Sequence, residues 1–66
     1  MRISPAPTES ETRTRILKSA LRLFARQGYD GTTTRDLAEA ANVAEGTLFR
    51  HFPNKKAILV EVATQG

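Results

Sequence analysis

The residues best suited to chemistry in this sequence lie between positions 45 and 51. Gly46 and Thr47 are adjacent, and Arg50 follows three positions later. Glycine lets a backbone approach a duplex closely, and a threonine side chain can bond a phosphate or touch a thymine methyl group. An arginine one helical turn further on can donate two hydrogen bonds to O6 and N7 of guanine. The spacing predicts contacts with DNA, with a helix-start glycine and a surface arginine as the ordinary alternative.

Two adjacent lysines, Lys55 and Lys56, follow Asn54, which we expect to cap a helix. They would then lie on the first helical turn, where the helix dipole opposes positive charge at a cost of about a few tenths of a kcal/mol each. A DNA phosphate bound by free backbone N–H groups would turn that cost into an attraction. The pattern therefore predicts a phosphate at this helix start.

Composition limits the chain to one small domain. It has 66 residues, no cysteine and a net charge of +3. Residues 13–56 include nine Lys or Arg but only four Asp or Glu. The excess favours a polyanionic partner, and an ordinary solvated basic face is the alternative. Neither a signal peptide nor an apolar run near the ~20 residues of a membrane span is present. We therefore expect a soluble, cytoplasmic protein.

Residues 1–7 contain Pro5 and Pro7 without apolar periodicity, which predicts a disordered arm. The domain itself is expected to span residues 8–66. Thr8 has capping-box spacing to Glu11 at the start of a first helix, and Ser10 or Thr12 are alternative caps. Gly28 is expected to end this helix in a left-handed conformation, with Tyr29 folding back. The apolar face comprises Ile16, Leu17, Ala20, Leu21 and Phe24, with Leu23 at its margin. The opposite face, expected to be mainly solvated, carries Arg15, Lys18, Arg22 and Arg26.

A short second helix is predicted by Thr33 and Asp36, which have capping-box spacing. It should end at Asn42, because asparagine tolerates the left-handed conformation, and Val43 should then plug the turn. The inward-facing residues of this helix are expected to be Leu37, Ala38 and Ala41.

Two further helices follow. The third should run from about Glu45 to His51, with Leu48 and Phe52 pointing inward, before Pro53 breaks it. The fourth should follow Asn54 and carry the apolar residues Ile58, Leu59, Val62 and Ala63. A short helix, a turn and a second short helix, packed against a longer preceding helix, form a helix-turn-helix. The predicted fold is therefore all-α and homeodomain-like: a three-helix bundle with a helix-turn-helix motif, plus a fourth helix.

Three stretches of the sequence closely resemble the N-terminal domain of TetR-family transcriptional regulators: GYDGTTTRDLA at 28–38, ANV at 41–43 and GTLFRHFPNK at 46–55. The likeness spans most of residues 11–63 without a gap. It implies a DNA-binding domain with residues 33–52 as its motif and the fourth helix as a lever to a C-terminal domain that this chain lacks. In the family that domain dimerises and holds a small-molecule effector.

The resemblance also implies a role for individual residues. Phosphates or the groove edge would be contacted at the second helix start by Thr33, Thr34 and Arg35. Bases and backbone would face Ala44, Glu45, Gly46 and Thr47. Along the groove would lie Phe49, Arg50 and His51, and Lys55 would clamp a phosphate. Three positions depart from the family, which more often has glycine at 42, serine at 44 and tyrosine at 49. Asn42 keeps the turn, whereas Ala44 cannot cap and Phe49 lacks the hydroxyl.

The partner implied is double-stranded DNA with a palindromic operator, bound by a repressor that an effector releases. The full-length protein would be a homodimer, and this chain alone a monomer. An enzyme is not expected, since there is no nucleophile elbow, phosphate-binding glycine loop or metal ligand set around His51, and hence no cofactor or metal. A membrane-surface peptide and a helical protein-interaction module are the remaining alternatives.

Overall fold

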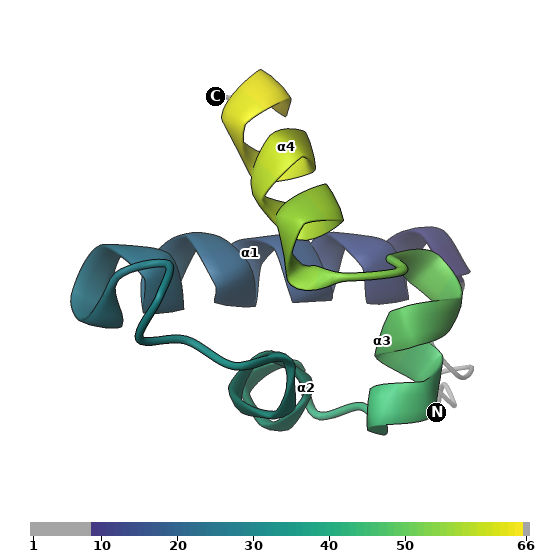
Figure 1. The fold of residues 1–66 in the computed structure, drawn as a ribbon. Helices are drawn as coiled ribbons and strands as arrows, with labels where there is room; N and C mark the ends of the chain where they lie inside the picture. Colours follow the sequence, from purple (N-terminus) through teal and green to yellow (C-terminus); the bar gives the residue numbers. More distant parts are fainter. Residues whose placement is uncertain (1–8, 66) are drawn as a thin grey trace, which may run out of the picture.

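The computed structural model describes residues 9–64 together with the backbone of Gln65. These residues form four helices and no strand: α1 (Glu9–Gln27), α2 (Thr34–Ala41), α3 (Glu45–His51) and α4 (Lys55–Gln65). In Figure 1, α2 and α3 lie below the long α1, and α4 rises above it. The predicted all-α fold with a helix-turn-helix is confirmed.

The first helix begins at Glu9, so the arm at 1–7 and the cap at Thr8 lie outside the described residues. The alternative caps Ser10 and Thr12 were wrong, because both lie inside α1. The helix ends as predicted at Gly28, which has φ +81° and donates its N–H to the carbonyl of Phe24 at 2.9 Å. Tyr29 then folds back onto the Phe24 ring, with 5.4 Å between ring centroids.

The buried face of α1 agrees with the expected one except at Leu21. Ile16 and Ala20 are fully buried, whereas Leu21 is 60% exposed. Each residue turns about 100° around a helix, so Leu21 lies a further 100° round from Ala20, beyond the strip that α2 and α4 cover. Leu23, expected at the margin, packs against the core instead.

The second helix is capped at both ends as predicted. The Thr33 hydroxyl accepts the Asp36 N–H at 3.0 Å, and the Asp36 carboxylate accepts the Thr33 N–H at 3.1 Å. Asn42 ends the helix in the left-handed conformation, with φ 61° and ψ 46°. Both predictions are confirmed, and Leu37 is fully buried beneath α1.

The third helix begins and ends as expected, and the fourth begins after Asn54 as expected. Phe52 is 2% exposed at the end of α3, and the Asn54 carboxamide oxygen accepts the Ala57 N–H at 2.8 Å to cap α4. Of the apolar residues of α4, Ile58 is fully buried, whereas Ala63 is exposed on the far half of the helix, which rises away from α1 (Figure 1). The core is shared, since each helix supplies at least one fully buried side chain, among them Ile16, Leu37, Leu48 and Ile58.

Arg13 of α1 contacts both the end of α3 and α4, which the sequence did not predict. The Arg13 guanidinium lies 4.7 Å from the centroid of the Phe52 ring and pairs with Glu61 at 2.9 Å. The guanidinium therefore covers the aromatic ring that anchors α3 while tying α1 to α4. A contact of this kind stabilises by about 0.5–1 kcal/mol at exposed sites and more when desolvated.

Candidate nucleic-acid interface

The turn between α2 and α3 is fixed by backbone hydrogen bonds. Its left-handed residue, Asn42, donates its N–H to Glu39, and the Val43 N–H is donated to the Ala38 carbonyl at 2.9 Å. Val43 is half-buried and packs against the core. The polypeptide therefore enters α3 in one defined direction, which a reading helix needs.

The front of α3 is open to solvent. Ala44, Glu45 and Gly46 are exposed, and Thr47 is half-buried. Ala44 takes the N-cap position but its side chain makes no capping hydrogen bond, as expected for alanine. A front with free backbone N–H groups and small side chains suits the close approach of a phosphate backbone.

Gly46 has no structural reason to be glycine. No heavy atom lies within 4 Å of where its Cβ would stand, and it has no positive φ. Glycine costs about 1 kcal/mol relative to alanine in a helix interior, which is an upper bound for Gly46 as the second residue of α3. The fold therefore gains nothing from the missing side chain, which leaves room on the outer face of α3 for something else.

The rear half of α3 carries three side chains with different exposure. Phe49 is 43% exposed, one of three large hydrophobic side chains that the described chain leaves open to solvent, with Leu21 and Val60. The Arg50 side chain is 65% exposed, whereas that of His51 is only 7% exposed. The structure thus presents Phe49 and Arg50 to solvent and largely covers the imidazole.

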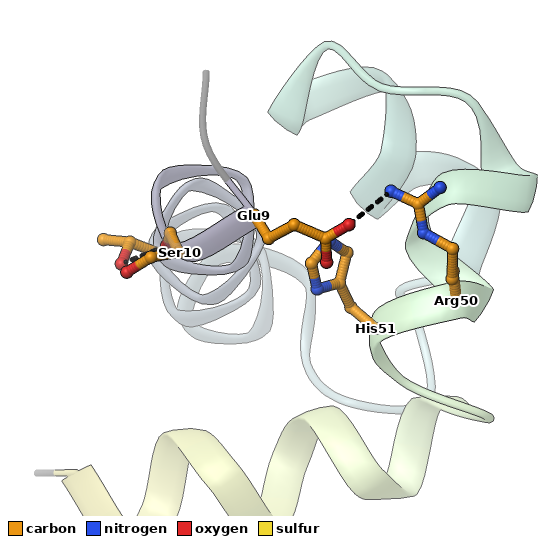
Figure 2. Close-up of polar contacts among 5 residues, drawn as sticks. Glu9, Ser10, Arg50 and His51 are labelled. Carbon is orange, nitrogen blue, oxygen red and sulfur yellow. Dashed lines mark hydrogen bonds and ion pairs between the residues drawn. The ribbon is translucent and has the colours of Figure 1, made fainter.

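Glu9 bridges the start of α1 and the end of α3. Figure 2 shows its carboxylate between Arg50 and His51: Oε2 accepts a hydrogen bond from Arg50 Nη2 at 3.0 Å, and Oε1 lies 3.8 Å from His51 Nε2. That nitrogen is buried and has no hydrogen-bond partner in the described part of the chain. Sequence reasoning missed Glu9, since nothing in the sequence links residues 41 positions apart.

The start of α2 supplies the other expected contacts. The Thr33 hydroxyl is engaged in the capping box, and Thr34 is half-buried. Arg35 is 77% exposed and lies 3.7 Å from Glu39, a weak surface pair. The pKa of Asp36 is lowered from its ordinary value of 3.8, chiefly by the hydrogen bond from the Thr33 backbone.

Lys55 is the expected site residue with the most internal contacts. Its Nζ donates to the carbonyls of Tyr29 at 2.7 Å and Thr32 at 2.9 Å, and lies 4.2 Å from the centroid of the Tyr29 ring. The ammonium therefore faces the turn between α1 and α2. Its phosphate contact stays a prediction. Lys56, the next residue, is exposed.

The described residues, 9–65, contain neither a candidate metal site nor a helix that could span a membrane. No cluster of three or more His, Cys, Asp or Glu residues in that range could hold a metal ion. None of the four helices there is long and apolar enough to cross a bilayer.

Comparison with known proteins gives one family. The model for bacterial regulatory proteins of the tetR family matches residues 16–62. An uncharacterized HTH-type transcriptional regulator, YvkB of Bacillus subtilis (strain 168), is 44% identical over 54 residues, which cover 82% of this chain and 29% of that protein. IcaR of Staphylococcus aureus (strain Newman) is the HTH-type negative transcriptional regulator of the biofilm operon icaADBC. It is 43% identical over 44 residues, which cover 67% of this chain and 24% of that protein. The chain spans less than a third of these relatives. No solved structure matches significantly.

Proposed function

This chain belongs to the tetR family of bacterial regulatory proteins, and we propose that its α2 and α3 read double-stranded DNA as a sequence-specific helix-turn-helix. In such a motif the second helix enters the major groove while the first crosses the phosphate backbone. The capped α2, the fixed turn at Asn42 and the exposed front of α3 support that arrangement.

Gly46 carries the proposal. An exposed glycine on a seven-residue helix weakens the helix, yet no atom of the described chain uses the space it leaves. A DNA backbone or base edge is a partner that requires this space, because a side chain there would hold the helix away from the groove.

The remaining contacts follow from exposure. We assign base reading to Thr47 and Arg50, whose side chains lie one turn apart on α3. The Phe49 ring, 43% exposed, would contact sugar or a thymine methyl group. Backbone contacts are assigned to Thr33, Thr34, Arg35, Ala44 and Glu45. The Glu9 carboxylate lies 3.8 Å from Nε2 of His51. A phosphate would therefore reach the His51 ring only after this carboxylate moved aside.

For the whole protein we propose a cytoplasmic repressor that acts as a homodimer on a palindromic operator. IcaR, a relative, is named a negative regulator, which supports repression. Two copies would bind half-sites about one helical turn, or ~34 Å, apart. Release by a small molecule would need a domain outside these residues.

A bulky substitution at Gly46 tests the proposed contact. Gly46→Leu places a side chain in open space, so the melting temperature should hold or rise, while affinity for a duplex selected from a random pool should fall by about tenfold or more. Ala25→Leu adds bulk to an exposed position of α1 and is the matched control. If Gly46→Leu binds the selected duplex as tightly as the control, α3 does not enter the groove.

A further inference from the structure

The helix α3 is anchored at both of its ends. Its start follows the turn at Asn42, and its end is held by the ring of Phe52, which is 2% exposed. Between these two points α3 packs mainly on α2. The orientation of α3 therefore depends on what holds the Phe52 ring in place.

Arg13 of α1 covers that ring. Its guanidinium carbon lies over the ring of Phe52, 4.7 Å from the centroid. A planar guanidinium can stack its face on an aromatic ring while the N–H groups at its edge bind an acceptor. Here Nη2 of Arg13 lies 2.9 Å from Oε2 of Glu61, a residue of α4. One side chain therefore contacts the end of α3 and the middle of α4 at the same time.

The ion pair between Arg13 and Glu61 is partly sheltered from water. The two side chains are 40% and 33% exposed, whereas those of Arg50 and Glu9 are 65% and 73% exposed. Water and salt screen an ion pair less as its exposure falls. Of these two pairs, the one at Arg13 is therefore expected to be the more persistent, and it keeps the guanidinium over the Phe52 ring.

Arg13 also provides a connection between helices that lie apart. In Figure 1, α4 and α3 lie on opposite sides of α1, and the main helix packings join α1 to α2, α1 to α4 and α2 to α3. A shift of α4 can therefore reach the end of α3 through the Arg13 side chain as well as through the linking residues 53–54.

We propose that Arg13 is a positioning residue for DNA reading: through its ion pair with Glu61 and its contact with the Phe52 ring, it couples the orientation of α3 to the position of α4. Its effect on DNA binding rests on the proposed function, whereas the coupling itself is measurable without DNA. Glu61 offers the sharper test, because two accounts predict opposite signs. Loss of a negative charge alone should tighten binding to a polyanion. Release of the guanidinium from the Phe52 ring should instead weaken binding to the selected duplex.

The first experiment compares Glu61→Gln with Asp30→Asn, which removes the same charge where the carboxylate makes no hydrogen bond or ion pair to a described residue. In Glu61→Gln, affinity for the selected duplex should fall by about three- to tenfold, while affinity for a random duplex should hold or rise. Asp30→Asn should leave the ratio of the two affinities unchanged. Equal gains on both duplexes in Glu61→Gln, or equal losses together with a lower melting temperature, would overturn the proposal.

A double-mutant cycle tests whether Glu61 acts through Arg13. In the Arg13→Gln background the carboxylate has no guanidinium to hold, so adding Glu61→Gln should not lower the ratio of selected to random affinity any further. A further loss of the same size as in the wild-type background would mean that Glu61 acts by another route, and the proposal would fail.

The coupling is measured by NMR on the protein without DNA. Protons above an aromatic face resonate upfield of their usual positions, so the side-chain N–H signals of Arg13 should lie upfield in wild type and move back in Glu61→Gln. The Phe52 N–H is donated to the Leu48 carbonyl at 2.8 Å, and its hydrogen exchange should accelerate by about threefold or more in that variant. Arg13 signals at their usual positions in wild type, or unchanged exchange at Phe52, would overturn the proposal. If wild type binds no duplex, the proposed function fails and the DNA-reading role of Arg13 fails with it, while these NMR results still decide the coupling.

Discussion

Arg50 Nη2 lies 3.0 Å from Oε2 of Glu9, so a carboxylate of α1 holds the guanidinium that we assign to base reading. Both side chains are well exposed, at 65% and 73%. Exposed pairs of this kind stabilise by only about 0.2–1 kcal/mol. The guanidinium can therefore exchange Glu9 for an acceptor on DNA at little cost.

Glu9→Gln should tighten DNA binding. It replaces the charge-assisted hydrogen bond to Arg50 with a weaker neutral one and removes a negative charge beside the expected path of the phosphates. From the strength of an exposed pair we expect about a two- to fivefold gain in affinity, measured by fluorescence anisotropy at constant salt.

Asp30→Asn is the matched control for Glu9→Gln. It removes the same charge at the other end of α1, where the carboxylate makes no hydrogen bond or ion pair to a described residue. An equal gain in both variants would mean that net charge alone is responsible. A loss in Glu9→Gln would mean that Glu9 prepares Arg50 for binding.

Arg50→Ala should relax base preference. A lost bidentate contact to guanine costs about 1–3 kcal/mol on the cognate duplex, with much less lost on a random one. Arg22→Ala removes the same charge from an exposed position of α1 and should leave the ratio of cognate to random affinity unchanged. Equal losses on both duplexes in Arg50→Ala would make it a phosphate contact and transfer specificity to Thr47, Glu45 or Thr34.

Phe52→Ala should unfold the domain or nearly so. The side chain is 2% exposed, and truncating a buried phenylalanine costs about 3–5 kcal/mol, most of the stability of a small domain. Phe49→Ala, at a 43% exposed ring, should change stability by about 0.5 kcal/mol or less. Thermal melting followed by circular dichroism compares the two, and similar melting temperatures would contradict the assigned core.

Asp36 should make stability depend on pH at the acid end. The hydrogen bond from the Thr33 N–H favours its ionised form and lowers its pKa below 3.8. The stabilisation is therefore complete above pH 3.8 and is lost as the pH falls through the lower folded-state value. The melting temperature of Asp36→Asn should fall less than that of wild type between about pH 5 and about pH 3, whereas Asp30→Asn should follow wild type.

Local signals predicted the helix-turn-helix well. The capping pair Thr33 and Asp36, the left-handed Asn42 and the helix-breaking Pro53 each act within a few residues, and each marks a helix boundary in the structure. Periodicity likewise identified the buried Leu48 and Phe52.

Contacts between distant segments could not be predicted in this way. Glu9 with Arg50, Arg13 with Phe52 and Lys55 with Tyr29 join residues far apart in the sequence. Lys55 illustrates the limit: the helix-dipole argument predicted an anion at this helix start, and the sequence did not reveal that the ammonium donates to backbone carbonyls of the α1–α2 turn. Leu21 was misplaced for a related reason, because its exposure depends on where α2 and α4 cross α1.

The surface that touches DNA tests the central claim most directly. Amide chemical shifts of the wild-type protein are recorded while the selected duplex is added, at low and at high salt. We expect the largest changes at 33–35 and 44–51, weakening steeply with salt as phosphate contacts require. Changes confined to the basic side of α1, around Lys18, Arg22 and Arg26, would show that DNA binds elsewhere and that α3 is not a reading helix.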